Sequence, residues 1–485
     1  MDNIILKTDS YKLNHWNQYP KGTTRVYSYL ESRKGAEFPY TIFFGLQAIL
    51  RKNLAGRVVT QKHINEAEKL CEVHFGRDGM FNRAMWQHIL RAHDGRLPVR
   101  IKAVPEGTLV PINNVMMTIE NTDDKCSSLT NAIESLLTHV WYPSTVVTLS
   151  HATKGVIRTV LEQSSDNMKG LDFMLHDFGY RGVSSNESAE FGGAAQLINF
   201  LGTDNVPAIM FLAEHYNNRN IDGVAYSVPA TEHSIMTSLG RDGEAALVRQ
   251  LIKDYPQGTL SVVADSYDIY YFVSNIMGSI LKDEILARDG VFVVRPDSIS
   301  GLHPTPATQV VWIMRALEDK FGVTTNSKGY KVLNPKVRVL WGDGINLKDL
   351  GAILFEVVSS GFSAENMATF GMGGGLLQKV NRDTQRFAFK SSWQMRDNVG
   401  YDIFKEPYDP SKISKKGRMK LVVSDITPSG YATVVEEDKR PDVMQTVFLN
   451  GKVMKSYTLS EVRKNASKAW PIPAPQINYG TTTQE

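Results

Sequence analysis

Three aspartates in the middle of the chain each follow a short apolar segment. They are Asp265, Asp297 and Asp343, which come after residues 260–264, 291–294 and 337–341. Carboxylates at successive strand ends suit ribose hydroxyls or a magnesium ion that phosphates hold. Asp is also a preferred N-cap residue, so capping of the following helices is the alternative for each. Asp343 lies between two glycines and fits ligand contact better.

A glycine run, Gly373-Gly374-Gly375 after Phe370-Gly371-Met372, could hold a phosphate group. Without side chains the backbone can approach an anion closely, and the N-terminus of a following helix adds a favourable dipole. A tight turn is the alternative for such a run. The run is neither a Walker A loop nor a dinucleotide-binding fingerprint, which disfavours a dinucleotide-dependent oxidoreductase.

Further candidates carry positive charge. Arg181 and Arg295 lie at or just after predicted strand ends, where a guanidinium suits phosphate, although surface ion pairs are the commoner fate of an arginine. His233 could be an acid/base, a phosphate acceptor or a polar core residue, and the adjacent Glu232 could orient its imidazole. No metal-ligand spacing accompanies His233, which disfavours a zinc site there. The basic stretch 414–418 is either a solvated loop or faces polyphosphate.

The middle of the chain predicts a scaffold for these residues. Six apolar segments alternate with helical patterns, which indicates parallel strands joined by crossover helices. The predicted strands are 173–175, 224–226, 260–264, 291–294, 337–341 and 368–370, and the predicted helices are 269–286, 307–321 and 347–358, the last with Asn346 as its N-cap. We therefore expect an irregular (β/α) barrel with a site at the carboxyl ends of its strands.

Both ends of the chain predict more β-structure. The predicted elements are strands 24–30, 99–103 and 115–119, a helix over 61–73, alternating Phe387 and Phe389, strands 421–423 and 431–435 paired across a turn at 427–430, a hairpin turn at Asn450-Gly451, and a last helix capped by Ser460, with a loose tail from residue 471. The predicted domains are a β-rich α+β domain from residues 1–165 plus 385–485 and an α/β barrel over residues 166–384.

Composition sets the class of protein. The chain has 485 residues, of which 42% are hydrophobic and 22% charged, as in soluble globular enzymes. A formal net charge of +3 and short basic clusters argue against nucleic-acid or membrane partners. Two cysteines, Cys71 and Cys126, suit a reducing interior, and no apolar run reaches the length of a membrane span. We expect a cytoplasmic protein.

The segments around these residues resemble the nicotinamide phosphoribosyltransferase family over nearly the whole chain. The shared motifs are Thr8-Asp9-Ser10-Tyr11-Lys12, His176-Asp177-Phe178-Gly179-Tyr180-Arg181-Gly182, Gly202-Thr203-Asp204, Tyr226-Ser227-Val228-Pro229, Asp265-Ser266-Tyr267-Asp268, Arg295-Pro296-Asp297-Ser298, Gly342-Asp343-Gly344, Gly373-Gly374-Gly375-Leu376-Leu377-Gln378-Lys379 and Ser414-Lys415-Lys416-Gly417-Arg418. The resemblance implies a type II phosphoribosyltransferase fold, with an irregular α/β barrel beside a β-rich domain. It also implies a homodimer with active sites at the subunit interface.

The resemblance implies an activity as well. The family makes nicotinamide mononucleotide and pyrophosphate from nicotinamide and phosphoribosyl pyrophosphate in NAD biosynthesis, with Mg²⁺ and with ATP as a stimulating co-substrate. By resemblance, His233 is the residue that ATP phosphorylates, His233, Asp297 and Arg295 are catalytic, and Asp265 is a candidate metal ligand.

Substrate-binding roles follow from the same resemblance. Phe178 and Tyr11, the latter from the other subunit, would sandwich the pyridine ring, because flat aromatic faces clamp such a ring well. The remaining residues would contact the carboxamide (Asp204, Ser227, Arg295), the ribose (Asp297, Gly342, Asp343), the 5′-phosphate (Gly373, Gly374), and phosphate or pyrophosphate, several of them across the dimer (Arg33, Arg181, Arg382, Lys390, Lys405).

The chain departs from the family pattern at three places. Ile299-Ser300 replaces the usual Gly-Asn, and Met372 and Ala388 each replace a serine. The segment after Arg33 is shorter than in animal members. Two other functions stay open: a nicotinate phosphoribosyltransferase on the same fold, and a binding or signalling protein. Loss of activity would be expected to erode the strand-end Asp, Arg and Gly residues, which are present together here.

Overall fold

The chain folds into two compact units, each built from segments that are distant in the sequence. The computed structural model describes residues 3–408, 412–425 and 430–468. Among the described residues, unit 1 comprises residues 3–148, Glu214–Arg219 and those from Asn381 onward, and unit 2 comprises Leu149–Ala213 and Asn220–Val380. Within the described ranges, no helix combines the length and the apolar character that crossing a membrane requires.

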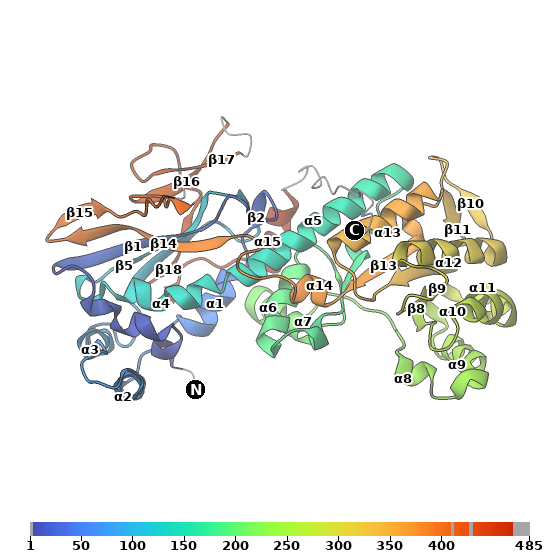
Figure 1. The fold of residues 1–485 in the computed structure, drawn as a ribbon, viewed down its shortest axis with the longest axis horizontal. Coiled ribbons are helices and arrows are strands. Elements are labelled where there is room, and N and C mark those ends of the chain that lie inside the picture. Colours follow the sequence, from blue (N-terminus) through green and yellow to red (C-terminus); the bar gives the residue numbers. More distant parts are fainter. Residues whose placement is uncertain (1–2, 409–411, 426–429, 469–485) are drawn as a thin grey trace. The chain divides into compact units, whose positions relative to one another are not determined.

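Unit 2 is organised by a six-stranded parallel sheet (Figure 1). Its strands, in the order β7-β6-β13-β12-β9-β8, are β6 (Leu175–Asp177), β7 (Gly202–Thr203), β8 (Gln257–Val263), β9 (Asp289–Arg295), β12 (Val337–Trp341) and β13 (Met367–Met372). One segment bridges both edges of this sheet, since Tyr226 pairs with Gly202 of β7 and Ala230 pairs with Ser261 of β8. The expected irregular α/β barrel is confirmed.

Five of the six predicted barrel strands are present. The predicted strand 224–226 is wrong, because only the isolated bridge at Tyr226 forms there. Strand β6 starts at Leu175, whereas Phe173 lies in a 3-10 turn, Leu171–Phe173. Strand β7 has two residues, which is too short for an alternating pattern to reveal it.

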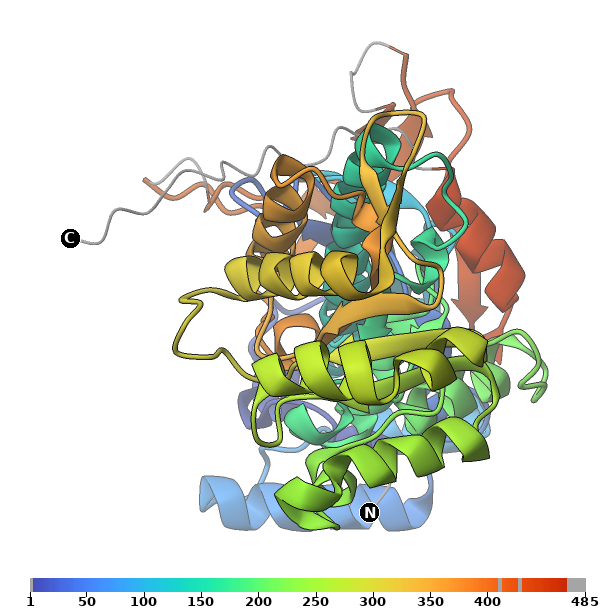
Figure 2. The ribbon, with the colours of Figure 1, turned by 90° about the vertical axis from the view of Figure 1, so that its right-hand side faces the viewer.

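Helices accompany the strands of unit 2, and Figure 2 shows the yellow and gold ones facing the viewer. They are α6 (Asn186–Gln196), α8 (His233–Met236), α9 (Gly240–Asp254), α10 (Ile269–Tyr271), α11 (Lys282–Ala287), α12 (Pro306–Phe321), α13 (Leu347–Ser359) and α14 (Gly374–Leu377), with a hairpin of β10 (Val323–Thr325) and β11 (Lys331–Leu333). Two helices, α5 (Trp141–Ser164) and α7 (Val206–Tyr216), are shared between the units. Asn346 caps α13 as predicted, in a capping box with Asp349. The predicted helix 269–286 is interrupted by a π-helix, Phe272–Ile280, whose wider turns break the regular α-helical period.

Unit 1 is built on a seven-stranded antiparallel sheet that joins both ends of the chain. Its order is β15-β14-β1-β5-β3-β18-β19, with β1 (Thr23–Ser32), β3 (Val99–Ala103), β5 (Val115–Asn121), β14 (Phe387–Arg396), β15 (Val399–Asp402), β18 (Gln445–Leu449) and β19 (Lys452–Val453). Smaller pairs are β2 (Tyr40–Ile42) with β4 (Leu109–Pro111) and β16 (Met419–Val423) with β17 (Tyr431–Val435). The helices include α1 (Leu46–Asn53), α2 (Gln61–Phe75), α3 (Arg83–Ala92), α4 (Leu129–Thr138) and α15 (Leu459–Ser467), and 3-10 segments include η2 (Ser10–Asn17) and η3 (Asp124–Cys126).

Two predictions near the C-terminal end have different outcomes: the hairpin turn is confirmed and the helix cap is wrong. Asn450 and Gly451 both have positive φ, 48° and 82°, and join β18 to β19 as predicted. The predicted cap at Ser460 is wrong, because Thr458 caps α15 in a capping box with Glu461. Residues 426–429 of the predicted turn and the tail from 471 lie outside the described residues.

Candidate active site

Phe178 follows β6 and lies against backbone that carries no side chains. A Cβ atom on Gly342 would come within 2.8 Å of the Phe178 ring, and one on Gly371 would come closer than any real carbon contact. The Phe178 amide donates to the Met372 carbonyl at 3.1 Å, which holds the ring at the end of β13. Glycine at 342 and 371 therefore lets an aromatic face sit at the carboxyl ends of β12 and β13.

Two other side chains contact the Phe178 ring. The guanidinium of Arg295 lies 5.1 Å from its centroid, and the imidazole of His176 meets it edge-on at 5.4 Å. Arg295 also donates from Nη2 to Asp297 Oδ1 at 2.8 Å. Its buried Nε has no hydrogen-bond partner among the described residues, which leaves one donor beside the ring.

Asp204 follows β7 and is held as a carboxylate. Partial burial opposes its ionisation, but hydrogen bonds from His176 and Ser227 and the charge of Arg295 hold its pKa below the usual range. His176 Nε2 and Ser227 Oγ both bond to the same atom, Asp204 Oδ1, at 3.0 and 2.6 Å. The interactions of the described residues thus converge on Oδ1 and leave Oδ2 as an acceptor.

His176 and Asp177 were not predicted as site residues, although both belong to the motif that contains Phe178. Asp177 is fully buried and accepts from the Gly179 amide at 2.7 Å and from Asn205 Nδ2 at 3.0 Å. Burial raises the pKa of Asp177 to about 6. The sequence signal for both residues is their position at the end of an apolar segment, directly before Phe178.

His233 begins α8 and is held by a carboxylate. Its Nε2 lies 3.1 Å from Asp265 Oδ1, and its Nδ1 lies 3.9 Å from Asp297 Oδ2. The expected partner Glu232 instead accepts from Ser234 Oγ, so the orienting carboxylate comes from the end of β8. With 48% of its side chain exposed, His233 is not a core histidine.

The three strand-end aspartates do not cap helices. The next N-caps along the chain are Asp268 for α10, Thr305 for α12 and Asn346 for α13. The side chain of Asp265 is instead buried, and its Oδ2 accepts from the Asp297 amide at 2.9 Å and from the Ser298 hydroxyl. Asp265 and Asp297 thus belong to one hydrogen-bonded network with His233, and Asp343 lies near enough to feel their charges.

Asp343 carries the electrostatic signature of that network. Burial and the negative charges of Asp297 and Asp265 raise the pKa of Asp343 above its usual range. A concentration of negative charge at the ends of β8, β9 and β12 is the environment in which a cation or a set of hydroxyl donors is stabilised.

The glycine run lies at the junction of β13 and α14, where Gly373 is the N-cap and Gly374 and Gly375 begin the helix. A Cβ on Gly374 would meet open space, whereas one on Gly373 would lie 3.1 Å from the Phe178 carbonyl. Gly182 lies beside Gly374, since its Cβ would be 3.8 Å from the Gly374 amide nitrogen. The exposed Arg181 therefore comes from a turn that adjoins the glycine run.

The remaining predicted residues belong to unit 1. Lys390 lies in β14, and burial together with the charges of Arg33, Lys405 and Arg382 lowers the pKa of Lys390. Three of the other four cations predicted to meet phosphate thus lie close enough to Lys390 to affect its charge, and such a cluster suits a polyanion. Tyr11 lies in η2, is 56% exposed, and contacts the ring of His15 edge-on at 5.0 Å.

The basic stretch 414–418 has local partners within unit 1. Lys415 pairs with Glu31, and Arg418 pairs with Glu120 at 2.8 Å and with Glu436. The Arg418 guanidinium also lies 4.8 Å from the ring of Tyr27. These two cations link the basic stretch to β1 and β5 of the antiparallel sheet.

Comparison with known sequences covers nearly the whole chain. Residues 173–452 match the nicotinate phosphoribosyltransferase (NAPRTase) family, and residues 3–101 match the nicotinamide phosphoribosyltransferase N-terminal domain. The chain is 44% identical to the nicotinamide phosphoribosyltransferase of Xanthomonas campestris pv. campestris (strain 8004), over 97% of this chain and 99% of that protein. It is 31% identical to that of Acinetobacter baylyi (strain ATCC 33305 / BD413 / ADP1), over 96% and 97% of the two chains.

Solved structures show the same fold at low sequence identity. Nicotinate-nucleotide pyrophosphorylase from Pyrococcus furiosus is 14% identical and matches with a TM-score of 0.61, over 96% of this chain and 95% of that chain. Human nicotinic acid phosphoribosyltransferase is 15% identical, with a TM-score of 0.50 over 95% and 93% of the two chains. The barrel and the antiparallel sheet are thus those of type II phosphoribosyltransferases.

Proposed function

Because the chain belongs to the nicotinamide phosphoribosyltransferase family, we propose that it joins nicotinamide to phosphoribosyl pyrophosphate. The products are nicotinamide mononucleotide and pyrophosphate, which places the enzyme in NAD biosynthesis. The observation that carries the proposal is the group of side chains at the strand ends, where Arg295 lies beside both the Phe178 ring and the Asp204 carboxylate, and Phe178 adjoins the glycine run.

The pyridine ring of nicotinamide stacks on Phe178. The far face of the ring is covered by Tyr11 of a second subunit, so that two aromatic faces clamp one flat ring. The exposure of Tyr11 in the single chain supports this arrangement, because a tyrosine that is half open to solvent has a face available for a ligand.

Asp204 recognises the carboxamide of nicotinamide by hydrogen bonding. Oδ2 of Asp204 accepts from the amide nitrogen, while Ser227 and His176 hold Oδ1. Arg295 donates toward the amide oxygen from the same side of the pocket. An ionised Asp204 would repel the carboxylate of nicotinate, which favours the amide over the acid.

The phosphoribosyl group lies across the ends of β9, β12 and β13. Asp297 and Asp343 accept from ribose hydroxyls beside Gly342, and the amides of Gly373 and Gly374 meet the 5′-phosphate. Arg181 adds positive charge next to that loop. The cluster of Arg33, Arg382, Lys390 and Lys405 from a second subunit binds phosphate and pyrophosphate.

The reaction is a displacement at the anomeric carbon of the ribose. The lone pair of the pyridine nitrogen forms the new N–C bond as the C–O bond to pyrophosphate breaks, and that electron pair leaves with pyrophosphate. The protein supplies no nucleophile for this step. It aligns the ring nitrogen with the sugar and neutralises the leaving group, so catalysis rests on positioning and electrostatics.

A magnesium ion fits the carboxylates at the strand ends. Burial, followed by the negative charges of Asp297 and Asp265, raises the pKa of Asp343, and a hydrated cation would offset both effects. Asp297 and Asp343 would hold it with the pyrophosphate. Asp265, the metal ligand that the family resemblance implies, would have to give up the hydrogen bonds it makes with His233, Ser298 and the Asp297 amide. When bound, the ion would neutralise charge on the leaving pyrophosphate.

ATP stimulates this reaction by phosphorylating His233. Because Nε2 of His233 donates to Asp265, the lone pair of Nδ1 is available to attack the γ-phosphorus of ATP, and ADP leaves. The partial exposure of His233 supports access for a nucleotide.

We further propose a homodimer in the cytoplasm, where a reducing environment suits two buried cysteines, Cys71 and Cys126, that are not joined in a disulfide.

Product analysis tests the proposal. Purified protein is incubated with nicotinamide, phosphoribosyl pyrophosphate and Mg²⁺, with and without ATP, and products are quantified by mass spectrometry. We expect nicotinamide mononucleotide and pyrophosphate in a one-to-one ratio, formed faster with ATP. Formation of nicotinate mononucleotide alone, from nicotinate, would identify the acid-specific enzyme, and absence of either mononucleotide would favour a binding protein.

A further inference from the structure

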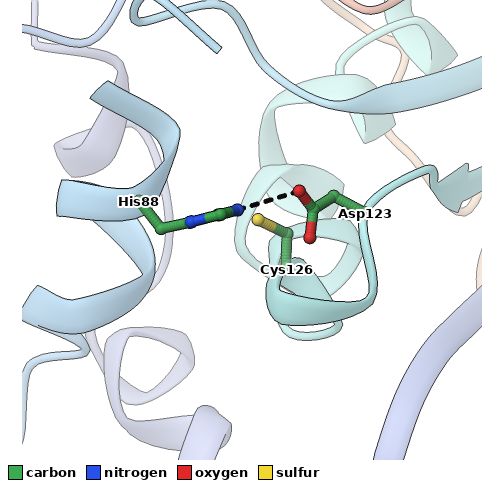
Figure 3. A group of neighbouring side chains, drawn as sticks. All are labelled: His88, Asp123 and Cys126. Atoms are coloured by element: carbon green, nitrogen blue, oxygen red, sulfur yellow. Dashed lines mark hydrogen bonds and ion pairs between the residues drawn. The ribbon is translucent and has the colours of Figure 1, made fainter. Parts of the chain in front are cut away.

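A second group of reactive side chains lies in unit 1 and shares no residue with the candidate active site. His88 lies in α3 and His93 is the residue that ends it, whereas Asp123 precedes η3 and Cys126 is its last residue. Figure 3 shows the side chains of His88, Asp123 and Cys126 turned toward one another. The group brings imidazole, carboxylate and thiol atoms to one place.

The distances within the group suit a metal ion. Asp123 Oδ2 lies 2.8 Å from His88 Nε2 and 2.7 Å from His93 Nε2. The potential ligand atoms of His88, Asp123 and Cys126 all lie within 4.8 Å of one another. In a tetrahedral zinc site with bonds of about 2.0–2.3 Å, ligand atoms are roughly 3.3–3.6 Å apart. Side-chain movements of about 1 Å would therefore bring the atoms of His88, Asp123 and Cys126 to coordinating distance, and His93 adjoins this group through Asp123 Oδ2.

The group is already held in position by its surroundings. Asp123 Oδ1 accepts from the Lys125 amide at 2.8 Å, which leaves Oδ2 for the two histidines. The Asp123 carbonyl accepts from Asn121 Nδ2 at 2.8 Å, and the two imidazoles meet edge-on at 5.6 Å. Partners of this kind orient the ligands of metal sites and raise their affinity.

We propose that His88, His93, Asp123 and Cys126 form a structural site for one Zn²⁺ ion. Nitrogen, oxygen and sulfur ligands together suit zinc better than magnesium or calcium, which prefer oxygen alone. Four protein ligands fill a tetrahedral site and leave no open position, so the ion would act as a clamp between α3 and η3. Both histidines and Asp123 are about one-quarter exposed, which gives the ion a route in.

The protonation states of the ligands set the conditions for binding. Partial burial opposes ionisation of Asp123, but hydrogen bonds from His88 and His93 lower its pKa to about 2, so it is a carboxylate. Burial, followed by the negative charge of Asp123, raises the pKa of Cys126 to about 12. The thiol proton must therefore leave when the ion binds, as in other thiolate metal sites.

Cobalt substitution tests the site in the untagged full-length protein. With Co²⁺ as the probe, we expect one equivalent to bind, with visible bands of a tetrahedral ion and a thiolate-to-cobalt charge-transfer band in the near ultraviolet. Cys126→Ser should lose the charge-transfer band. Cys71→Ser, which changes the other buried cysteine, should keep it. No charge-transfer band in the unmutated protein, or the same band in Cys126→Ser, would overturn the proposal.

Zinc affinity provides a second readout that survives if Cys126→Ser fails to fold. His88→Gln alters a partly exposed side chain and should weaken Zn²⁺ binding tenfold or more in competition with a chelator. Adding Zn²⁺ should raise the melting temperature of the unmutated protein and of Cys71→Ser, and raise it less for His88→Gln. Equal zinc affinities in the unmutated protein and His88→Gln would refute the assignment.

Discussion

The two oxygens of Asp204 have different tasks, and this difference makes a selective mutation possible. His176 and Ser227 both donate to Oδ1, which an asparagine at this position would retain as its amide oxygen. Oδ2, the atom assigned to the substrate, would become an NH₂ group. Asp204→Asn therefore removes the charge and the acceptor that face the ligand and keeps the neighbouring hydrogen bonds available.

We predict that Asp204→Asn lowers kcat/KM for nicotinamide by about tenfold or more and narrows the preference over nicotinate, because one charge-assisted hydrogen bond contributes about 1.5–3 kcal/mol. Steady-state kinetics with both substrates measure this. A melting temperature close to that of the unmutated protein controls for folding. An unchanged ratio of the two kcat/KM values would show that Asp204 does not read the exocyclic group.

A mutation of His233 tests the proposed phosphorylation by ATP. His233→Ala should abolish ATP stimulation and ATP hydrolysis and leave slow ATP-independent synthesis of the mononucleotide, because the phosphate acceptor is lost while the ring pocket stays. Glu232→Gln is the matched control, since Glu232 contacts Ser234 and not the imidazole. Full ATP stimulation in His233→Ala would contradict the phosphorylated intermediate.

At the scale of the elements, glycine residues at the ends of β12 and β13 leave room for the aromatic ring of Phe178. An alanine methyl group at Gly371 would overlap the ring of Phe178, so Gly371→Ala must displace that ring. We expect KM for nicotinamide to rise tenfold or more and the free energy of unfolding to fall by about 1–3 kcal/mol. Gly301→Ala, where a methyl group meets open space, is the control. An unchanged KM for nicotinamide in Gly371→Ala would show that Phe178 does not bind the pyridine ring.

A buried carboxyl links two elements of unit 1 and predicts a pH effect on stability. Glu106 accepts from the Gln47 amide in the first turn of α1 at 2.6 Å and from the Tyr216 hydroxyl at 2.8 Å, and burial raises its pKa to about 7. Its protonated form is the one the fold favours. The stability it contributes is therefore complete below about pH 4.5 and is lost as the pH rises through about 7.

Denaturant unfolding from pH 5 to pH 8 measures this contribution. We predict that Glu106→Gln, which stays neutral, loses less stability than the unmutated protein over that range, by one or a few kcal/mol. Parallel curves for the two proteins would mean that Glu106 ionises freely in the fold.

Sequence patterns captured the elements that are long or chemically marked. Alternating or continuous apolar segments predicted β8, β9 and β12, and Asn450-Gly451 predicted a hairpin, because each pattern is local. The strand at Tyr226 was wrong, since an isolated bridge to Gly202 depends on the closure of the sheet. The π-helix within 269–286 and the pairing of His233 with Asp265, 32 residues away, also depend on tertiary contacts that local periodicity does not encode.

Most residues of the candidate site were predicted from the motifs that the chain shares with a known family. Residue types alone left Asp265 open to helix capping and His233 open to a core role, and burial and hydrogen bonds have now excluded both alternatives. The zinc-binding group was missed because its two pairs of ligands are separated by about thirty residues with no repeated spacing.

At the scale of the whole molecule, the predicted residues divide between the two units. Tyr11 and the four clustered cations belong to unit 1, whereas Phe178, Asp204 and the glycine run belong to unit 2. A composite site from two subunits would use both groups. We predict that Tyr11→Ala and Phe178→Ala proteins, each inactive alone, regain activity when mixed, because a heterodimer carries one intact site.

Subunit exchange must be shown for that experiment, by native mass spectrometry of differently labelled chains. Up to about one-quarter of the unmutated activity is expected when exchange is complete, since half of the dimers are mixed and each mixed dimer has one of two sites intact. No recovery despite complete exchange would place Tyr11 and Phe178 in a site within one subunit or separate their roles.

The preference of the unmutated protein for nicotinamide over nicotinate tests the central claim most directly. Two unit charges about 4 Å apart at an effective dielectric near 20 repel by about 4 kcal/mol, of which Arg295 offsets a part. We therefore expect kcat/KM for nicotinamide to exceed that for nicotinate by a hundredfold or more, measured at saturating phosphoribosyl pyrophosphate with Mg²⁺ and ATP. Comparable values for the two substrates, or a preference for nicotinate, would contradict the account.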